Sequence, residues 1–225
     1  SPTSTQSSVI PIPTVEIEKY LAFIILIVHW LTIMDILIAT RNPGKFKEIS
    51  VMLKPLEARF FSPSDLGITD DFDETGGVSY EENALGKARF YSKRAEGMTV
   101  VADDSGLVVD ALKGELGVQT RRWGAGEQAS DEVWLDFFLK RMEAEENRQA
   151  AFVCAAALKL PDGTEHVFTK KTPGSLCHQL NAPIQPGIPL SSVFLPEGHD
   201  KVYAAMTHEE KNTLSHRGRA FAEIL

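Results

Sequence analysis

The sequence predicts an α/β fold whose functional groups lie at the ends of its strands. From Met34 onward, short apolar segments of strand length alternate with longer segments of helical pattern. Within Val100–Val109, the adjacent carboxylates Asp103 and Asp104 stand between two apolar runs. An ionised carboxylate is costly to bury unless cations or donors satisfy it, so this pair predicts a metal site at a strand end. The alternative is a tight turn, because Asp, Ser and Gly all favour turns.

The first predicted elements follow Met34 directly. Asp35–Ala39 is predicted to be a buried strand. The helix that follows covers Gly44–Leu53 and ends before Pro55, which cannot continue it. Ala58–Phe61 fits a second strand, and an acidic loop follows it from Asp65 to Thr75.

Capping residues and turn signals define the remaining elements. Ser and Thr N-caps, two of them with a Glu three residues later, predict helix starts. A Pro-Asp-Gly turn predicts a hairpin between two of the later strands. The expected elements are a helix from Ser79 with Glu82 to about Gly97, a strand at Thr99–Ala102, a helix from Ser130 to Met142, a hairpin of Ala150–Leu160 with Glu165–Thr169, and helix starts at Thr207 with Glu210 and at Ser215.

Length, charge and cysteine content narrow the functional classes. A chain of 225 residues with 43% hydrophobic content is sufficient for one core, and we expect 34–225 to form a single domain. The net charge of −8 argues against a nucleic-acid polymer as partner, yet permits a small anion held by a few lysines. Cys154 and Cys177 show neither metal spacing nor a disulfide framework, which favours a reducing cytoplasm.

Residues 1–33 are predicted to be an N-terminal extension outside the fold. Ser1–Ser8 is rich in Ser and Thr, and Tyr20–Ile33 is apolar. A membrane anchor is the first alternative, but the apolar run reaches about 20 residues only by including Asp35. A secretory signal is the second, but the basic start that it needs is absent. We favour an upstream extension before a natural start at Met34.

The turn at Thr40–Lys45 is a candidate phosphate-binding segment. It joins the first strand to its helix, where free backbone N–H groups and the positive end of the helix dipole attract anions. Lys45 falls in the first helical turn, where a cation is disfavoured unless something negative compensates it. The alternative is an ordinary Asn-Pro-Gly turn with a solvated lysine.

Two further groups of polar residues are candidates for substrate contacts. Asn83 and Lys87 are four residues apart and share one helix face, although a solvated face is the alternative. Near the chain end, Lys211 and Ser215–Arg217 form a donor cluster around a helix start. The alternative is that these basic residues belong to a frayed helix end near the C-terminus and bind nothing.

Together these segments resemble the inosine triphosphate pyrophosphatase family. The resemblance implies an elongated central mixed β-sheet whose flanking helices form two lobes around a nucleotide cleft. It also implies a homodimer and Mg2+-dependent hydrolysis of ITP, dITP and XTP to the monophosphate and pyrophosphate. The segments that carry the resemblance are Thr40–Lys45, Glu82–Ala88, Ala102–Leu107 with Asp110–Leu112, and Glu209–Asn212 with Ser215–Gly218.

The resemblance also implies roles for individual residues. Asp104 would act as metal ligand and general base, and Glu74 would be the second metal ligand. Lys211, His216 and Arg217 would bind the 6-keto oxygen of hypoxanthine or xanthine, where adenine carries an amino group. The other residues expected to bind substrate are Thr40, Arg41, Asn42, Pro43, Gly44, Lys45, Lys87 and Ser105.

The sequence departs from the family pattern in one segment above all. Where the family has a Gly-Phe-Gly-Tyr-Asp-Pro-like loop whose ring stacks on the base, this chain has Pro186–Ser192, without an aromatic residue. The resemblance is lost over Lys170–Ser192 and recovered on both flanks, as a local reading-frame slip would cause. Glu74 is also one residue farther from Glu82 than usual, so Asp73 or Thr75 are alternative equivalents. The alternative functions are a catalytically weakened nucleotide-binding relative and a Maf-like nucleotide pyrophosphatase.

Overall fold

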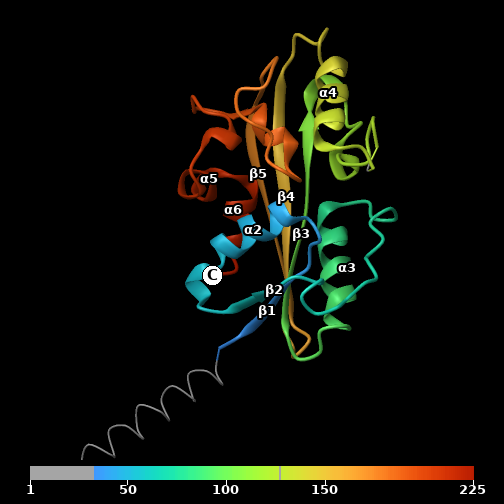
Figure 1. Cartoon of the computed structure of the whole chain (residues 1–225), viewed down its shortest axis with the longest axis vertical. Coiled ribbons are helices and arrows are strands. Elements are labelled where there is room, and N and C mark those ends of the chain that lie inside the picture. Colours follow the sequence, from blue (N-terminus) through green and yellow to red (C-terminus); the bar gives the residue numbers. More distant parts are fainter. Residues whose placement is uncertain (1–32, 127) are drawn as a thin grey trace, which may run out of the picture. The chain divides into compact units, whose positions relative to one another are not determined.

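The computed structural model of the chain describes residues 33–126 and 128–225 (Figure 1). Met34–Leu225 forms one compact unit. Residues 1–32, which make up nearly all of the predicted N-terminal extension, lie outside the described part. Among the helices of the two described ranges, none combines the length and the apolar character needed to cross a membrane.

A six-stranded mixed sheet forms the centre of this unit, which confirms the α/β prediction. The strand order is β2-β1-β3-β4-β5-β6. β1 lies parallel to both of its neighbours, and every pairing from β3 to β6 is antiparallel. The strands are β1 (Asp35–Ile38), β2 (Arg59–Phe61), β3 (Thr99–Val109), β4 (Gln149–Lys159), β5 (Glu165–Leu176) and β6 (Phe194–Pro196).

Helices cover both faces of the sheet, because alternate strand residues point to opposite sides. On one face α3 packs its small residues on alanines of β3 and β4. On the other face α2 and α6 pack against Val101 and Cys154, and Figure 1 shows α3 on the opposite side from these two helices. The helices are α2 (Pro43–Met52), α3 (Tyr80–Ser92), α4 (Asp131–Arg141), α5 (His208–Leu214) and α6 (His216–Phe221).

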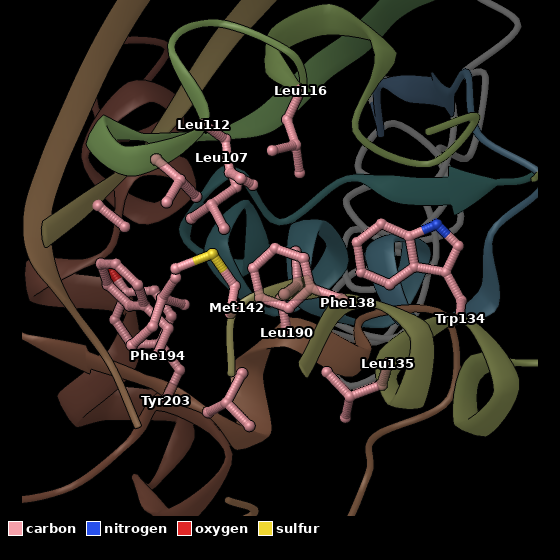
Figure 2. Close-up of a cluster of buried hydrophobic side chains, with 14 residues drawn as sticks. Leu107, Leu112, Leu116, Trp134, Leu135, Phe138, Met142, Leu190, Phe194 and Tyr203 are labelled. Carbon is pink, nitrogen blue, oxygen red and sulfur yellow. The ribbon is translucent and has the colours of Figure 1, made fainter. Parts of the chain in front are cut away.

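A third apolar cluster lies beside α4. Trp134 and Phe138 of α4 stack with their ring planes 10° apart and contact the far end of β3 around Leu107. Figure 2 shows these rings in one cluster with Phe194 and Tyr203. Trp134 and Tyr203 of this cluster also line a cavity that contains most of the predicted site residues.

β3 is longer than predicted, and the tight-turn alternative for the Asp pair is wrong. The strand continues through Asp103 and Asp104 to Val109 because it pairs with β4 from Val100 to Val109. β1, in contrast, pairs with β3 only as far as Ile38 opposite Val101. The two carboxylates therefore lie beyond the carboxyl end of β1, in the middle of β3, and not at the end of their own strand as predicted.

The other boundaries differ less from prediction. α3 ends at Ser92 and not near Gly97, and Gly97 adopts a positive φ of 79° in the turn before β3. β5 continues past the predicted Thr169 to Leu176, still paired with β4. The capping box at Thr207 is complete. At Ser79 the side chain caps the helix, but the Glu82 carboxylate accepts from the Val78 N–H and not from Ser79.

Gly106 allows β3 to lie close to the loop around Gly117. Gly106→Ala is therefore expected to destabilise the fold. A Cβ there would lie 2.2 Å from the Gly117 carbonyl oxygen and 2.9 Å from the Tyr80 hydroxyl. We expect a loss of about 1–3 kcal/mol in the free energy of unfolding, measured by urea denaturation. The control is Gly76→Ala, where an added Cβ meets no atom within 4 Å. Equal stability of the two variants would contradict this packing argument.

Candidate active site

A cavity of about 390 Å³ opens where β1 leaves the sheet beside β3. Eleven of the residues predicted from sequence line it, whereas Pro43 and Gly44 are not among its lining residues. The eleven are Thr40, Arg41, Asn42, Lys45, Glu74, Lys87, Asp104, Ser105, Lys211, His216 and Arg217.

Asp104 is a buried carboxylate on the α3 side of β3. It accepts hydrogen bonds from Asn83 Nδ2 and from the Ser105 backbone N–H, both at 2.9 Å. Burial raises the pKa of Asp104 above its ordinary value, and the nearby Glu74 adds to the rise, although Lys45 and Lys87 oppose it. Asp104 is therefore a stronger base than an exposed aspartate.

Asp103 points to the opposite face of the sheet, towards α2 and α6. Its Oδ2 lies 3.2 Å from Lys45 Nζ and 3.1 Å from Arg217 Nε. Burial alone raises the pKa of Asp103, but Lys45, Arg217 and Lys87 together hold it below its ordinary value. The sequence predicts a metal site for the Asp103–Asp104 pair, but Asp103 pairs with Lys45 and Arg217 and does not line the cavity.

Glu74 and Lys87 form an ion pair beside Asp104. Lys87 is buried and also donates to the Asp103 backbone carbonyl at 3.1 Å. Burial lowers the pKa of Lys87, but Glu74, Asp103 and Asp104 more than reverse this, so the ammonium remains charged. Arg122 Nη1 approaches Glu74 at 3.5 Å. Lys87 is thus a buried cation and not part of a solvated face.

The backbone at the start of α2 is already satisfied by Asn42. The Asn42 Oδ1 accepts from the N–H groups of Gly44 and Lys45 at 2.9 and 3.1 Å, and Pro43 has no N–H. The N–H groups of Gly44 and Lys45 are therefore not free, contrary to the prediction. The alternative of a solvated lysine is also wrong, since Lys45 pairs with Asp103. Cationic side chains, not amides, supply the positive charge here.

Glu48 is a buried partner of two predicted site residues, and the sequence analysis missed it. Its buried carboxylate pairs with Lys211 and lies 2.5 Å from Arg217 Nη1. Burial raises the pKa of Glu48, but these two cations bring it below its ordinary value. The available signal was its position three residues after Lys45, on the same side of one helix.

His216 is a buried, neutral ring at the same end of the cavity. It stacks on Phe152 with centroids 4.6 Å apart and ring planes 9° apart. Burial, together with the charges of Arg217 and Lys211, lowers the pKa of His216 well below its ordinary value. Its Nδ1 is buried without a hydrogen-bond partner in the structure. A neutral imidazole can donate from one nitrogen and accept at the other.

The segment that departs from the family pattern forms one wall of the cavity. Its Gly187 donates its N–H to Asp131 Oδ2 at 2.6 Å and accepts from Asn42 Nδ2 at 2.8 Å. Ile188 and Leu190 line the cavity in place of an aromatic residue. Aromatic rings nevertheless reach the cavity from other elements, namely Phe72, Trp134, Phe152 and Tyr203.

Comparisons with known proteins place related sequences along most of the chain. A sequence model of the Ham1 family matches residues 36–225. The chain is 42% identical over 199 residues to the dITP/XTP pyrophosphatase of Streptomyces coelicolor, covering 84% of this chain and 94% of that protein. It is 34% identical over 192 residues to the dITP/XTP pyrophosphatase of Bacillus subtilis, with coverages of 84% and 94%.

Two solved structures show the same fold. A HAM1 protein from Coxiella burnetii superposes with a TM-score of 0.71 and 29% identity, covering 85% of this chain and 96% of that one. The dITP/XTP pyrophosphatase of Mycobacterium abscessus has a TM-score of 0.63 and 39% identity, with coverages of 85% and 99%.

Glu48→Gln is expected to destabilise the protein strongly, because it removes the counter-charge that two buried cations, Lys211 and Arg217, share. Breaking a buried ion pair costs about 3–5 kcal/mol, and urea denaturation would measure that loss. The control is Asp136→Asn, which removes an exposed i,i+4 pair with Lys140 and should cost about 0.5 kcal/mol or less. A similarly small loss for Glu48→Gln would contradict the structural importance of this carboxylate.

The depressed pKa of His216 predicts a pH dependence of stability. Above about pH 6.5 the imidazole is neutral in both the folded and the unfolded chain. As the pH falls below that value, only the unfolded chain gains the proton, so the free energy of unfolding decreases. His216→Gln should reduce this decrease between pH 7.5 and 5.5 in urea titrations, whereas His199→Gln, at an exposed position, should not. An unchanged slope for His216→Gln would show that the ring takes up a proton as readily in the fold as in the unfolded chain, contrary to this prediction.

Proposed function

The chain belongs to the Ham1 family, and we propose from this premise that it hydrolyses non-canonical purine nucleoside triphosphates. The substrates are ITP, dITP and XTP, and the products are the nucleoside monophosphate and pyrophosphate. The observation that carries the proposal is the buried Asp104, a carboxylate with raised pKa between cationic residues that face one cavity. This reaction removes unwanted purine nucleotides from the nucleotide pool.

In this proposal Asp104 is the general base. It takes a proton from the water that attacks the phosphorus joining the monophosphate to the leaving pyrophosphate. Lys45 and Lys87 lie near it and neutralise negative charge that develops on the phosphate oxygens. Thr40 and Ser105 add neutral hydroxyl groups to the same cavity. Asn83 holds the Asp104 carboxylate in position.

The site fits a Mg2+ ion held by Asp104 and Glu74. The two carboxylates face one cavity and are close enough for Glu74 to raise the pKa of Asp104, a repulsion that a cation would relieve. Within the described ranges, no group of three or more His, Cys, Asp or Glu side chains is arranged to hold a metal. Two carboxylates completed by water and phosphate oxygens are a usual Mg2+ environment. Bound there, Mg2+ would neutralise phosphate charge.

Lys211, His216 and Arg217 select the base in this proposal. Their donors suit the 6-keto oxygen of hypoxanthine or xanthine, whereas the amino group of adenine would leave buried donors without acceptors. Glu48 holds the charged members of this group, and Phe152 holds the imidazole ring. Selectivity therefore depends on side chains that are already fixed before substrate binds.

A second candidate is a nucleotide-binding relative with weakened catalysis. The observation that favours it is the aromatic-free segment Pro186–Ser192 in the cavity wall. Stacking of a base on an aromatic side chain contributes about 1–3 kcal/mol in single-strand sites, so its loss would weaken base binding before phosphate chemistry.

Assembly and location are further parts of the proposal. A homodimer is supported by the family resemblance. A cytoplasmic location is supported by the two free thiols, Cys154 and Cys177. The net charge of −8 supports a free nucleotide, and not a nucleic-acid polymer, as the partner.

Pyrophosphate release from ITP, XTP, dITP, GTP and ATP, with and without Mg2+, tests the proposed function. We expect Mg2+-dependent turnover of ITP, dITP and XTP, and a loss of about 10²–10⁴-fold in Asp104→Asn, because an amide cannot accept the proton. No turnover by folded wild-type protein that still binds ITP would favour the second candidate. Turnover of pyrimidine or methylated nucleotides instead would favour a Maf-like activity.

A further inference from the structure

Arg41 belongs to the turn between β1 and α2, but its guanidinium contacts a different segment, the loop that contains Ile68 and Asp71. Its Nη2 lies 2.8 Å from the carbonyl oxygens of both Ile68 and Asp70. Its Nε lies 3.3 Å from Asp71 Oδ2. Since Nη2 carries two N–H groups, these two carbonyls use both of them. The guanidinium therefore has three contacts with the segment that leads to Glu74.

That segment, residues 68–74, contains no helix or strand. Its position thus depends on side-chain anchors and not on a backbone ladder. Ile68 is buried, the Tyr91 hydroxyl donates to Asp71 Oδ1 at 2.7 Å, and Phe72 packs so closely on Gly86 that a Cβ there would lie 2.5 Å from its ring. Arg41 is the anchor that comes from the phosphate-binding turn.

Glu74 follows the anchored Asp71 by only three residues, a stretch of at most about 10–11 Å. A displacement of the backbone at Ile68–Asp71 would therefore carry over to the Glu74 carboxylate. That carboxylate has to reach Lys87 and, in the proposed reaction, the metal. Metal ligands tolerate little displacement, and loss of the groups that orient them typically costs 10–100-fold in metal affinity or activity.

We propose that Arg41 is a positioning residue that acts through Glu74, and not a phosphate ligand as the sequence predicts. It holds the loop that carries one metal ligand against the turn that carries Lys45. The inference rests on the proposed function, because the role of Glu74 as a metal ligand is part of that function.

Binding of Mn2+ to the full chain, followed by electron paramagnetic resonance, tests this inference without relying on turnover. We expect Arg41→Ala and Glu74→Gln each to weaken Mn2+ binding, Arg41→Ala by about tenfold. The double variant should bind no more weakly than Glu74→Gln alone, because Arg41 acts through Glu74. Arg41→Lys, which keeps a cation and three donors, should restore part of the affinity. Thermal unfolding of each variant establishes that it is folded.

The matched control is Arg94→Ala, which removes an arginine that follows α3 and contacts the same loop. Arg94 Nε contacts the exposed side chain of Asp70 at 2.7 Å and no backbone carbonyl of the loop, so Mn2+ affinity should change by less than about twofold. Unchanged Mn2+ binding in Arg41→Ala, with a raised KM for ITP at saturating Mg2+, would overturn the inference and make Arg41 a phosphate ligand. Unchanged binding in Glu74→Gln would also overturn it.

The experiments distinguish a failure of the proposed function from a failure of this inference. If wild-type protein releases no pyrophosphate from ITP but Mn2+ binding follows the expected pattern in the variants, the proposed reaction is wrong and the positioning role of Arg41 stands. If wild-type protein turns over ITP but Arg41→Ala and Arg94→Ala bind Mn2+ equally well, the reaction stands and the positioning role is wrong.

Discussion

The ionised Asp103 in the middle of β3 is the group on which the arrangement of the site depends. Its carboxylate contacts Lys45 of α2 and Arg217 of α6 on one face of the sheet. Its backbone carbonyl accepts from Lys87 of α3, which packs on the other face. One strand residue thus connects the helices of both layers through charged groups. Because these charges are buried, each depends on the others to remain favourable.

Charge balance explains how so many cations remain in one buried region. Lys45 pairs with Asp103, Lys87 with Glu74, and Lys211 with Glu48. A triphosphate that enters therefore competes with carboxylates for the same ammonium groups. The lysines are held in place by these carboxylates before substrate arrives, which reduces the reorganisation needed for binding.

Local signals in the sequence predicted most of the helices and strands, since caps and apolar spacing act over a few residues. The extent of β3 was not predictable in this way. Asp-Ser-Gly favours a turn locally, and only pairing with the distant β4 keeps the segment extended. The site residues were predicted through family resemblance, but the direction of the Arg41 side chain and the burial of Glu48 were not. Both depend on segments far away in the sequence, the loop at 68–71 for Arg41 and helices α5 and α6 for Glu48.

The side-chain amide of Asn42 also limits how this position can vary during evolution. Its oxygen caps α2 and its nitrogen donates to Gly187 in the opposite wall of the cavity. An aspartate would keep the acceptor and lose the donor, whereas a lysine would keep a donor and lose the cap. Both replacements lie one base change away from an asparagine codon, yet each sacrifices one of the two bonds. The turn and the cavity wall are therefore constrained to change together. A sequence change in the wall has to keep the backbone carbonyl of Gly187 directed at Asn42.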